Sequence, residues 1–255
     1  MCLLAFAWKQ HPHYKLILAS NRDEFYKRRS ASAAFWEEAP AVLAGKDLEA
    51  GGTWMGLNKD LKQWTALTNY RDPQNIRPDA PSRGQLTSRY LLHDYSPQQY
   101  LEEVLPAIDQ YNGFNLLVGN TETMMYVSNY ENRLRVLAPG VYGLSNHLLD
   151  TPWYKVTTLK QKLAQALASD HITVASLFDI LHDPMPAPDA AVQQTGLKFE
   201  LEKMLSAPFI ISPNYGTCCS SVLLIDNENQ AVFAERWYNT ATKTPETQVF
   251  SIDLA

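Results

Sequence analysis

Residues 2–24 read CLLAFAWKQHPHYKLILASNRDE and contain two apolar runs separated by a polar turn. The runs Cys2 to Trp8 and Tyr14 to Ala19 are dominated by apolar, β-branched and aromatic residues, a pattern that is typical of strands. If residues 11–13 form the loop of a hairpin, the end of the second run returns toward the start of the chain. The polar cluster Asn21 to Glu24, which follows this run, is then expected to lie near Cys2.

Outward from this hairpin, the sequence predicts blocks of strands that alternate with blocks of helices. Further strands are predicted at 41–44, 53–57, 63–68, 114–119, 124–128, 220–226, 231–237 and 248–254. Helices are predicted at 85–93, from the N-cap Ser96 to Pro106, and in two stretches with apolar stripes, 156–167 and 174–181. Segregated blocks of this kind favour an α+β fold in which two mainly antiparallel sheets carry helices on their outer faces. We expect residues 1–255 to form a single domain.

The composition excludes several classes of protein. The 255 residues carry a formal net charge of -5, and 45% of them are hydrophobic. A chain of this charge offers no basic surface to phosphate backbones, so nucleic acid is not expected as a partner. No apolar run is long enough to cross a bilayer, and three cysteines do not make a disulfide framework. We therefore expect a cytoplasmic protein without a membrane span, whose oligomeric state the sequence leaves open.

Cys2 is the best candidate for a catalytic nucleophile. Removal of Met1 would give Cys2 a free α-amine, whose pKa of about 7.7–8.0 lies well below that of a lysine. Such an amine can act as the general base for the thiol of the same residue. From position alone, the alternative is that Cys2 is a small apolar residue at the start of a buried strand.

The cluster Asn21 to Glu24 favours the catalytic interpretation of Cys2. In the predicted hairpin, Asp23 is placed to orient the α-amine, and the charge of Arg22 is placed to favour a thiolate. The cluster is also compatible with a solvated turn that is rich in charge.

Several further motifs occur along the chain. They are Ala44 to Gly56 (AGKDLEAGGTWMG), Ala66 to Arg71 (ALTNYR), Ser82 to Gly84 (SRG), Tyr111 to Leu116 (YNGFNL) and Gly143 to Trp153 (GLSNHLLDTPW). Together with Cys2 and the Asn21 to Glu24 cluster, these motifs resemble the NRDE family, which includes the transport and Golgi organisation proteins of eukaryotes. The resemblance covers most of the chain.

The NRDE family is in turn similar to N-terminal nucleophile hydrolases of the bile-salt hydrolase and penicillin V acylase type. This similarity implies a four-layer αββα sandwich and an N-terminal cysteine that attacks an amide. It assigns the orienting carboxylate to Asp23, and the oxyanion donors to Asn146 and to Asn69 or Tyr70.

Two positions differ from the pattern of those proteins. Ser20 stands where the acylases have an arginine before their Asn-x-Asp element, and Cys218 follows Tyr215 to Thr217 where the family usually has an arginine. Stabilisation of a thiolate at Cys2 would then have to come from Arg22 or from elsewhere in the protein.

Three more residues complete the predicted site as contacts to substrate, namely Asn21, Trp54 and His147. Trp54 would form an aromatic wall of the pocket, and His147 would serve as an acid beside Asn146. As isolated residues, they fit core or surface positions equally well. Adjacent cysteines on one strand point to opposite faces, so Cys218 and Cys219 are expected to be buried and structural. No group of residues has the spacing typical of a metal site, and no glycine-rich nucleotide motif is present, so we predict no metal and no cofactor.

The sequence supports two functions. The first is a cysteine amidohydrolase or acyltransferase that acts on a small acylated substrate through a thioester at Cys2. The second is a non-enzymatic carrier or trafficking protein that holds a hydrophobic ligand in the same cavity. For this second function, the resemblance implies a lipid, an acyl-CoA or a haem as the ligand. Retention of Met1 would favour the carrier.

Overall fold

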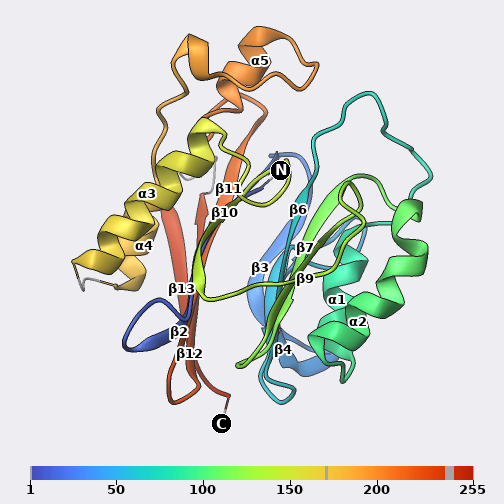
Figure 1. The fold of residues 1–255 in the computed structure, drawn as a ribbon, viewed down its shortest axis with the longest axis vertical. Coiled ribbons are helices and arrows are strands. Elements are labelled where there is room, and N and C mark those ends of the chain that lie inside the picture. Colours follow the sequence, from blue (N-terminus) through green and yellow to red (C-terminus); the bar gives the residue numbers. More distant parts are fainter. Residues whose placement is uncertain (1, 170–171, 239–243, 255) are drawn as a thin grey trace.

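Two antiparallel sheets face each other in the computed structural model, which describes residues 2–169, 172–238 and 244–254. The helices lie on the outer faces of the sheets, with α3 and α4 on one side of the molecule and α1 and α2 on the other (Figure 1). The fold is therefore α+β, and its layers follow the predicted order of helix, sheet, sheet and helix.

The first sheet contains the strand that carries Cys2. Two of its strands, β1 and β2, pair antiparallel from Cys2 opposite Arg22 to Trp8 opposite Leu16. This register confirms the predicted hairpin. In spatial order, the strands are β10 (Gly140–Leu144), β1 (Cys2–Trp8), β2 (Tyr14–Phe25), β11 (Tyr215–Asp226), β12 (Gln230–Tyr238) and β13 (Pro245–Asp253).

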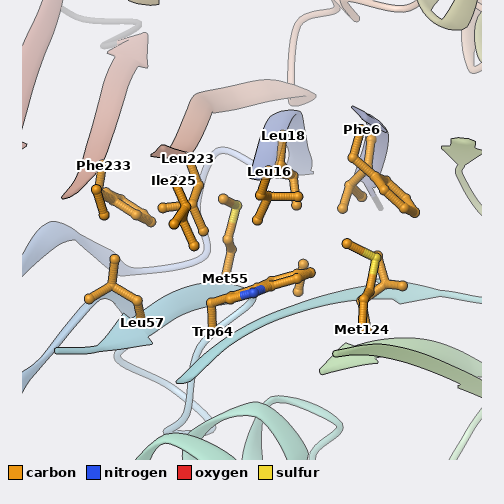
Figure 2. Close-up of a cluster of buried hydrophobic side chains, with 14 of the residues drawn as sticks. Phe6, Leu16, Leu18, Met55, Leu57, Trp64, Met124, Leu223, Ile225 and Phe233 are labelled. Atoms are coloured by element: carbon orange, nitrogen blue, oxygen red, sulfur yellow. The ribbon is translucent and has the colours of Figure 1, made fainter. Parts of the chain in front are cut away.

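The second sheet is a meander in which each strand pairs with the next along the chain. Its strands are β3 (Ser30–Trp36), β4 (Ala39–Asp47), β5 (Met55–Asn58), β6 (Gln63–Asn69), β7 (Phe114–Gly119), β8 (Met124–Ser128) and β9 (Arg135–Val136). Apolar side chains from both sheets meet between the layers. Figure 2 shows Trp64 and Met124 of the second sheet pointing toward Leu16, Leu18 and Phe6 of the first.

The helices cover the outer faces with their apolar stripes. Ser96 caps its helix by accepting a hydrogen bond from the backbone N–H of Gln99, as the sequence predicts. Leu159 and Phe178 are fully buried against the first sheet. The helical segments are α1 (Gly84–Leu92), α2 (Pro97–Val104), η1 (Leu105–Gln110), α3 (Tyr154–Ala168), α4 (Val174–Leu181), η2 (Asp189–Ala191) and α5 (Phe199–Met204).

One strand differs from the prediction in a way that shapes the site. β2 does not end at Ala19 but continues to Phe25, so the cluster Asn21 to Glu24 lies within the sheet and not in a solvated turn. β11 pairs with β2 up to Phe25, and this pairing satisfies the backbone of a polar segment that would otherwise end the strand. In the part of the chain that the structure describes, no helix is long and apolar enough to cross a membrane.

Candidate active site

A polar cavity of about 480 Å³ opens where β1, β2 and β6 meet the loop before α1. We call it the Cys2 cavity. Its lining includes Cys2, Arg22, Asp23, Glu24, Arg28, Asp47, Thr53, Trp54, Asn69, Arg83, Gly84, Asn112 and residues of the loop 78–82. The hairpin of β1 and β2 and the more distant strand β6 therefore contribute polar side chains to one cavity.

The Cys2 side chain lies at the wall of this cavity and is 8% exposed. The Ser145 hydroxyl donates a hydrogen bond of 3.0 Å to the Cys2 carbonyl, which ties the start of β1 to the segment after β10. Burial raises the pKa of the Cys2 thiol, although the charge of Arg22 opposes that shift. The thiol is thus mainly neutral near pH 7.

Arg22 faces the second sheet. Asp23, the next residue along β2, faces the opposite side, because successive side chains of a strand point to opposite faces. The Arg22 guanidinium lies over the Trp54 ring, 4.4 Å from the centroid, and 3.9 Å from the Glu24 carboxylate. Gly45 makes room for this stack, because a Cβ atom at Gly45 would lie 2.4 Å from the indole. The stack keeps a buried cation beside Cys2.

Asp23 faces the helices on the other side of the first sheet. Its Oδ1 accepts a hydrogen bond of 2.8 Å from Thr217, which is opposite Asp23 on β11. Burial raises the pKa of the Asp23 carboxyl, and the charge of Lys155 on α3 opposes that shift. Burial also lowers the pKa of Lys155 to about 8. A carboxylate and a lysine therefore influence each other inside the protein, next to the start of β1.

Asn69 ends β6 and lines the Cys2 cavity. The Asn146 side chain, which is not among the lining residues, donates a hydrogen bond of 2.9 Å to the Asn69 carbonyl. On its other side, the Asn146 Oδ1 atom is 3.5 Å from the Lys155 Nζ atom. A chain of contacts thus runs from α3 through Asn146 to Asn69.

A second cavity of about 550 Å³ adjoins the first and shares Asn69, Arg83 and Asn112 with it. We call it the apolar cavity. Its remaining lining comes from the strand end and loop at 70–73 and 75–76, from Gly113, from four residues around α5 (Leu197, Leu201, Met204 and Leu205), and from Tyr215 and Phe25. The site therefore combines a polar and an apolar compartment.

Comparisons with known proteins agree with the sequence motifs. The family model described as "Transport and Golgi organisation 2" matches residues 1–240. The human "Transport and Golgi organization protein 2 homolog" is 38% identical, over 92% of both chains. The mouse homolog is 37% identical over 100% of this chain and 99% of its own, and the Drosophila melanogaster protein is 31% identical over 92% and 91%. The chain belongs to the transport and Golgi organisation 2 family.

In this member of the transport and Golgi organisation 2 family, five of the predicted site residues line the Cys2 cavity together. They are Cys2, Arg22, Asp23, Trp54 and Asn69. Tyr70 lines the apolar cavity instead, and its backbone N–H is used in a hydrogen bond of 2.8 Å to the Gly113 carbonyl. Of the two donors proposed at this strand end, Asn69 is therefore the one that lines the Cys2 cavity.

Two predicted substrate contacts of this family member lie elsewhere. The Asn21 amide is fully buried and donates to the Leu181 and Pro208 carbonyls, so it connects β2 to the end of α4. His147 accepts or donates a hydrogen bond of 2.8 Å with the Tyr70 hydroxyl, outside the residues that line either cavity. Burial lowers the pKa of His147.

Sequence reasoning missed three charged residues of this site, Lys155, Arg71 and Arg83. Lys155 is fully buried in an otherwise ordinary amphipathic helix, and no local pattern marks it. Arg71 and Arg83 lie within the motifs Ala66 to Arg71 and Ser82 to Gly84, and membership of these motifs was the signal that could have identified them. Cys218 and Cys219 are both buried, as expected, and Cys218 lies at an irregularity in the β11–β2 pairing.

Proposed function

We propose that this protein is an N-terminal cysteine amidohydrolase or acyltransferase that acts on a small acylated substrate. The observation that carries this proposal is the shared cavity, in which a buried thiol, a buried guanidinium and the Asn69 amide come from β1, β2 and β6. A nucleophile, a cation and a neutral donor in one cavity are the groups that acyl transfer requires. The predicted similarity to N-terminal nucleophile hydrolases supports the same chemistry.

The first step is the activation of the thiol. Met1 lies outside the described residues, and the proposal requires its removal. Because Cys2 pairs with Arg22 in an antiparallel register, the Cys2 nitrogen lies on the side of Asp23. The neutral α-amine then takes the proton of the thiol, Asp23 stabilises the resulting ammonium, and Arg22 stabilises the thiolate.

The second step is the transfer of the acyl group. The Cys2 Sγ atom bonds to the acyl carbon, and the Asn69 amide donates to the oxyanion while Asn146 holds the Asn69 backbone in place. The carbon–nitrogen bond breaks as the α-ammonium returns its proton to the leaving amine. Water or an acceptor amine then attacks the thioester and restores the thiol.

A carrier of a hydrophobic ligand is the second candidate function, and the apolar cavity is the observation that favours it. The relatives' names refer to transport and Golgi organisation, which fits a carrier as well as an enzyme. Three free cysteines, all buried, support a reducing compartment such as the cytoplasm for either function.

The decisive experiment is intact mass spectrometry followed by peptide mapping after exposure to an acylating probe. Cys218 is a matched internal control, since it is also 8% exposed. The proposal predicts loss of Met1, rapid acylation of Cys2 over Cys218, and turnover of acyl amides or thioesters that Cys2→Ala abolishes.

Retained Met1, or labelling of Cys2 no faster than that of Cys218, would exclude the hydrolase mechanism. If Cys2→Ala and wild type then bind a fluorescent fatty acid equally well, the carrier function is the one that remains.

A further inference from the structure

Two residues that line the Cys2 cavity each carry a buried donor that has no hydrogen-bond partner within the residues that the structure describes. The donors are Nη1 of Arg22 and Nε1 of Trp54. The two side chains are 6% and 7% exposed, they stack on each other at 4.4 Å, and both line the cavity. A buried donor without an acceptor is costly, so such donors indicate a place that a ligand fills.

The nearby carboxylates do not complete this arrangement. Glu24 lies 3.9 Å from Arg22 and 3.8 Å from Arg28, which are distances of loose ion pairs and not of hydrogen bonds. Asp47 is occupied by Arg28 at 2.7 Å and by the backbone N–H groups of Glu49 and Ala50. The Arg22 guanidinium therefore keeps a donor for another acceptor.

A second guanidinium reaches the same cavity from the loop before α1. Arg83 donates a hydrogen bond of 2.9 Å to the Gly113 carbonyl, and it lines both cavities. Burial lowers the pKa of Arg83, although negative charge at Cys2 and Glu24 opposes that shift. Arg22, Trp54 and Arg83 thus line one cavity, where an oxygen-rich anion would accept hydrogen bonds from both guanidinium groups and from the indole N–H.

We propose that Arg22, Trp54 and Arg83 form an anion-binding subsite beside Cys2 that takes a carboxylate or phosphate group. The substrate that this subsite implies is one whose leaving amine carries the anionic group, and this part of the inference rests on the proposed function. The thioester intermediate forms at Cys2, and the subsite holds the departing amine by its anion. The apolar cavity, across Asn69, is left for the acyl group.

Protection of Cys2 against alkylation tests the subsite without any turnover. Iodoacetamide labelling is followed by mass spectrometry at constant ionic strength, with increasing inorganic phosphate in one series and acetate in the other. We expect at least one anion to slow labelling of Cys2 threefold or more, with no effect on labelling of glutathione. The preferred anion distinguishes a phosphate ligand from a carboxylate ligand.

Variants assign the protection to the named groups. Trp54→Phe keeps the ring and removes the N–H, and Arg83→Gln removes the charge; each should raise the half-protecting concentration at least fivefold. Arg29→Gln is the matched control, since Arg29 is a nearby exposed arginine outside the lining of the Cys2 cavity. Circular dichroism of each variant verifies that it is folded.

The outcomes separate this inference from the proposed function. Absence of protection by both anions at about 100 mM, far above the millimolar Kd of a weak site, would overturn the subsite. An equal loss of protection in Arg29→Gln would overturn it too, because a general charge effect would then suffice. Protection without turnover of any acyl substrate would support the subsite and reject the hydrolase. If acyl amides are turned over, kcat/KM should favour a charged leaving amine over its uncharged counterpart by tenfold or more, and Arg83→Gln should reduce that preference.

Discussion

The Cys2 thiol is surrounded by opposing influences on its charge. Burial raises its pKa, and Arg22 lowers it, with burial the larger of the two. We therefore predict that alkylation of Cys2 keeps accelerating with pH beyond about 8.5, where the thiolate fraction of an exposed cysteine begins to level off. The measurement is the rate of iodoacetamide labelling from pH 6 to pH 10, with glutathione as the reference. A plateau below that of glutathione would mean that the cation dominates.

Lys155 is the residue whose protonation should be visible in stability. Burial lowers its pKa to about 8, whereas an unfolded lysine titrates near 10.4. Between these values the unfolded chain binds more protons than the folded chain, so the free energy of unfolding gains an increment as pH rises from 8 to 10.4. Lys155→Met should lack this increment in urea titrations at a series of pH values.

A lysine on the same helix provides the control for that prediction. Lys162 reaches the surface and pairs with Asp183 at 2.6 Å. Lys162→Met should keep the wild-type rise in stability and should change stability by less than about 1 kcal/mol. If both variants lose the rise equally, Lys155 does not titrate in the folded protein.

The site residues differ in how far the sequence could predict them. Cys2, Arg22 and Asp23 could be placed together because a hairpin with a short polar turn brings its two strand ends side by side. The pairing of Asn69 with Asn146 depends on contacts between the second sheet and the segment after β10, which no local pattern encodes. Lys155 was missed because its buried charge is compensated only in three dimensions.

Among the elements, short apolar runs bounded by polar turns and a capping residue predicted the bounds well, and short or irregular elements were not predicted. β1, β7 and β8 have the predicted bounds, and the Ser96 cap begins α2 as expected. β3 was missed because it contains small residues and an irregular pairing with β4 between Ala31 and Ala34. α5 is only six residues long, so its position depends on tertiary contacts and not on helical propensity.

One carboxylate holds α5 over the apolar cavity. Glu202 forms an ion pair of 2.8 Å with Arg71, and both side chains are almost fully buried. The same carboxylate accepts hydrogen bonds from the backbone N–H and hydroxyl of Thr195. The Arg71 backbone N–H in turn donates to the Asn146 carbonyl. α5 is thus attached to the strand end that carries Asn69.

We therefore predict that Glu202→Gln loosens α5 while the sheets stay folded. Removal of one partner leaves a buried guanidinium without its counter-charge, a change that typically costs about 3–5 kcal/mol when the whole structure must absorb it. A surface helix can instead open locally, so amide hydrogen exchange at 195–205 should increase at least tenfold with little change in β1 and β11. Lys203→Met, which breaks only the exposed pair with Asp189, is the control on the same helix. Uniform exchange across the chain would show that Glu202 supports the global fold.

A buried carboxylate joins the two sheets of the molecule. Glu235 of β12 in the first sheet accepts a hydrogen bond of 2.6 Å from the Ala33 backbone N–H of β3 in the second sheet. Its other donors include the Trp237 indole, at 2.6 Å, and the Ser221 hydroxyl, at 3.2 Å. These donors are uncharged, and burial raises the pKa of Glu235 despite their hydrogen bonds. The contact between the sheets therefore depends on a group that tends to bind a proton.

The raised pKa of Glu235 gives a prediction for the stability of the whole fold. The folded state binds a proton at Glu235 more tightly than the unfolded state does. The contribution of Glu235 to the free energy of unfolding is therefore present below about pH 4.3 and declines as pH rises through the raised pKa. Glu235→Gln keeps an acceptor for Ala33 and Trp237 and offers its amide N–H to Ser221, without the buried charge. In urea unfolding, this variant should be more stable than wild type at pH 8 by on the order of 1 kcal/mol, and the difference should vanish toward pH 4. Glu246→Gln, on the exposed edge strand β13, is the control and should show no such trend. If Glu235→Gln is instead less stable than wild type at pH 8, the ionised carboxylate holds the sheets together.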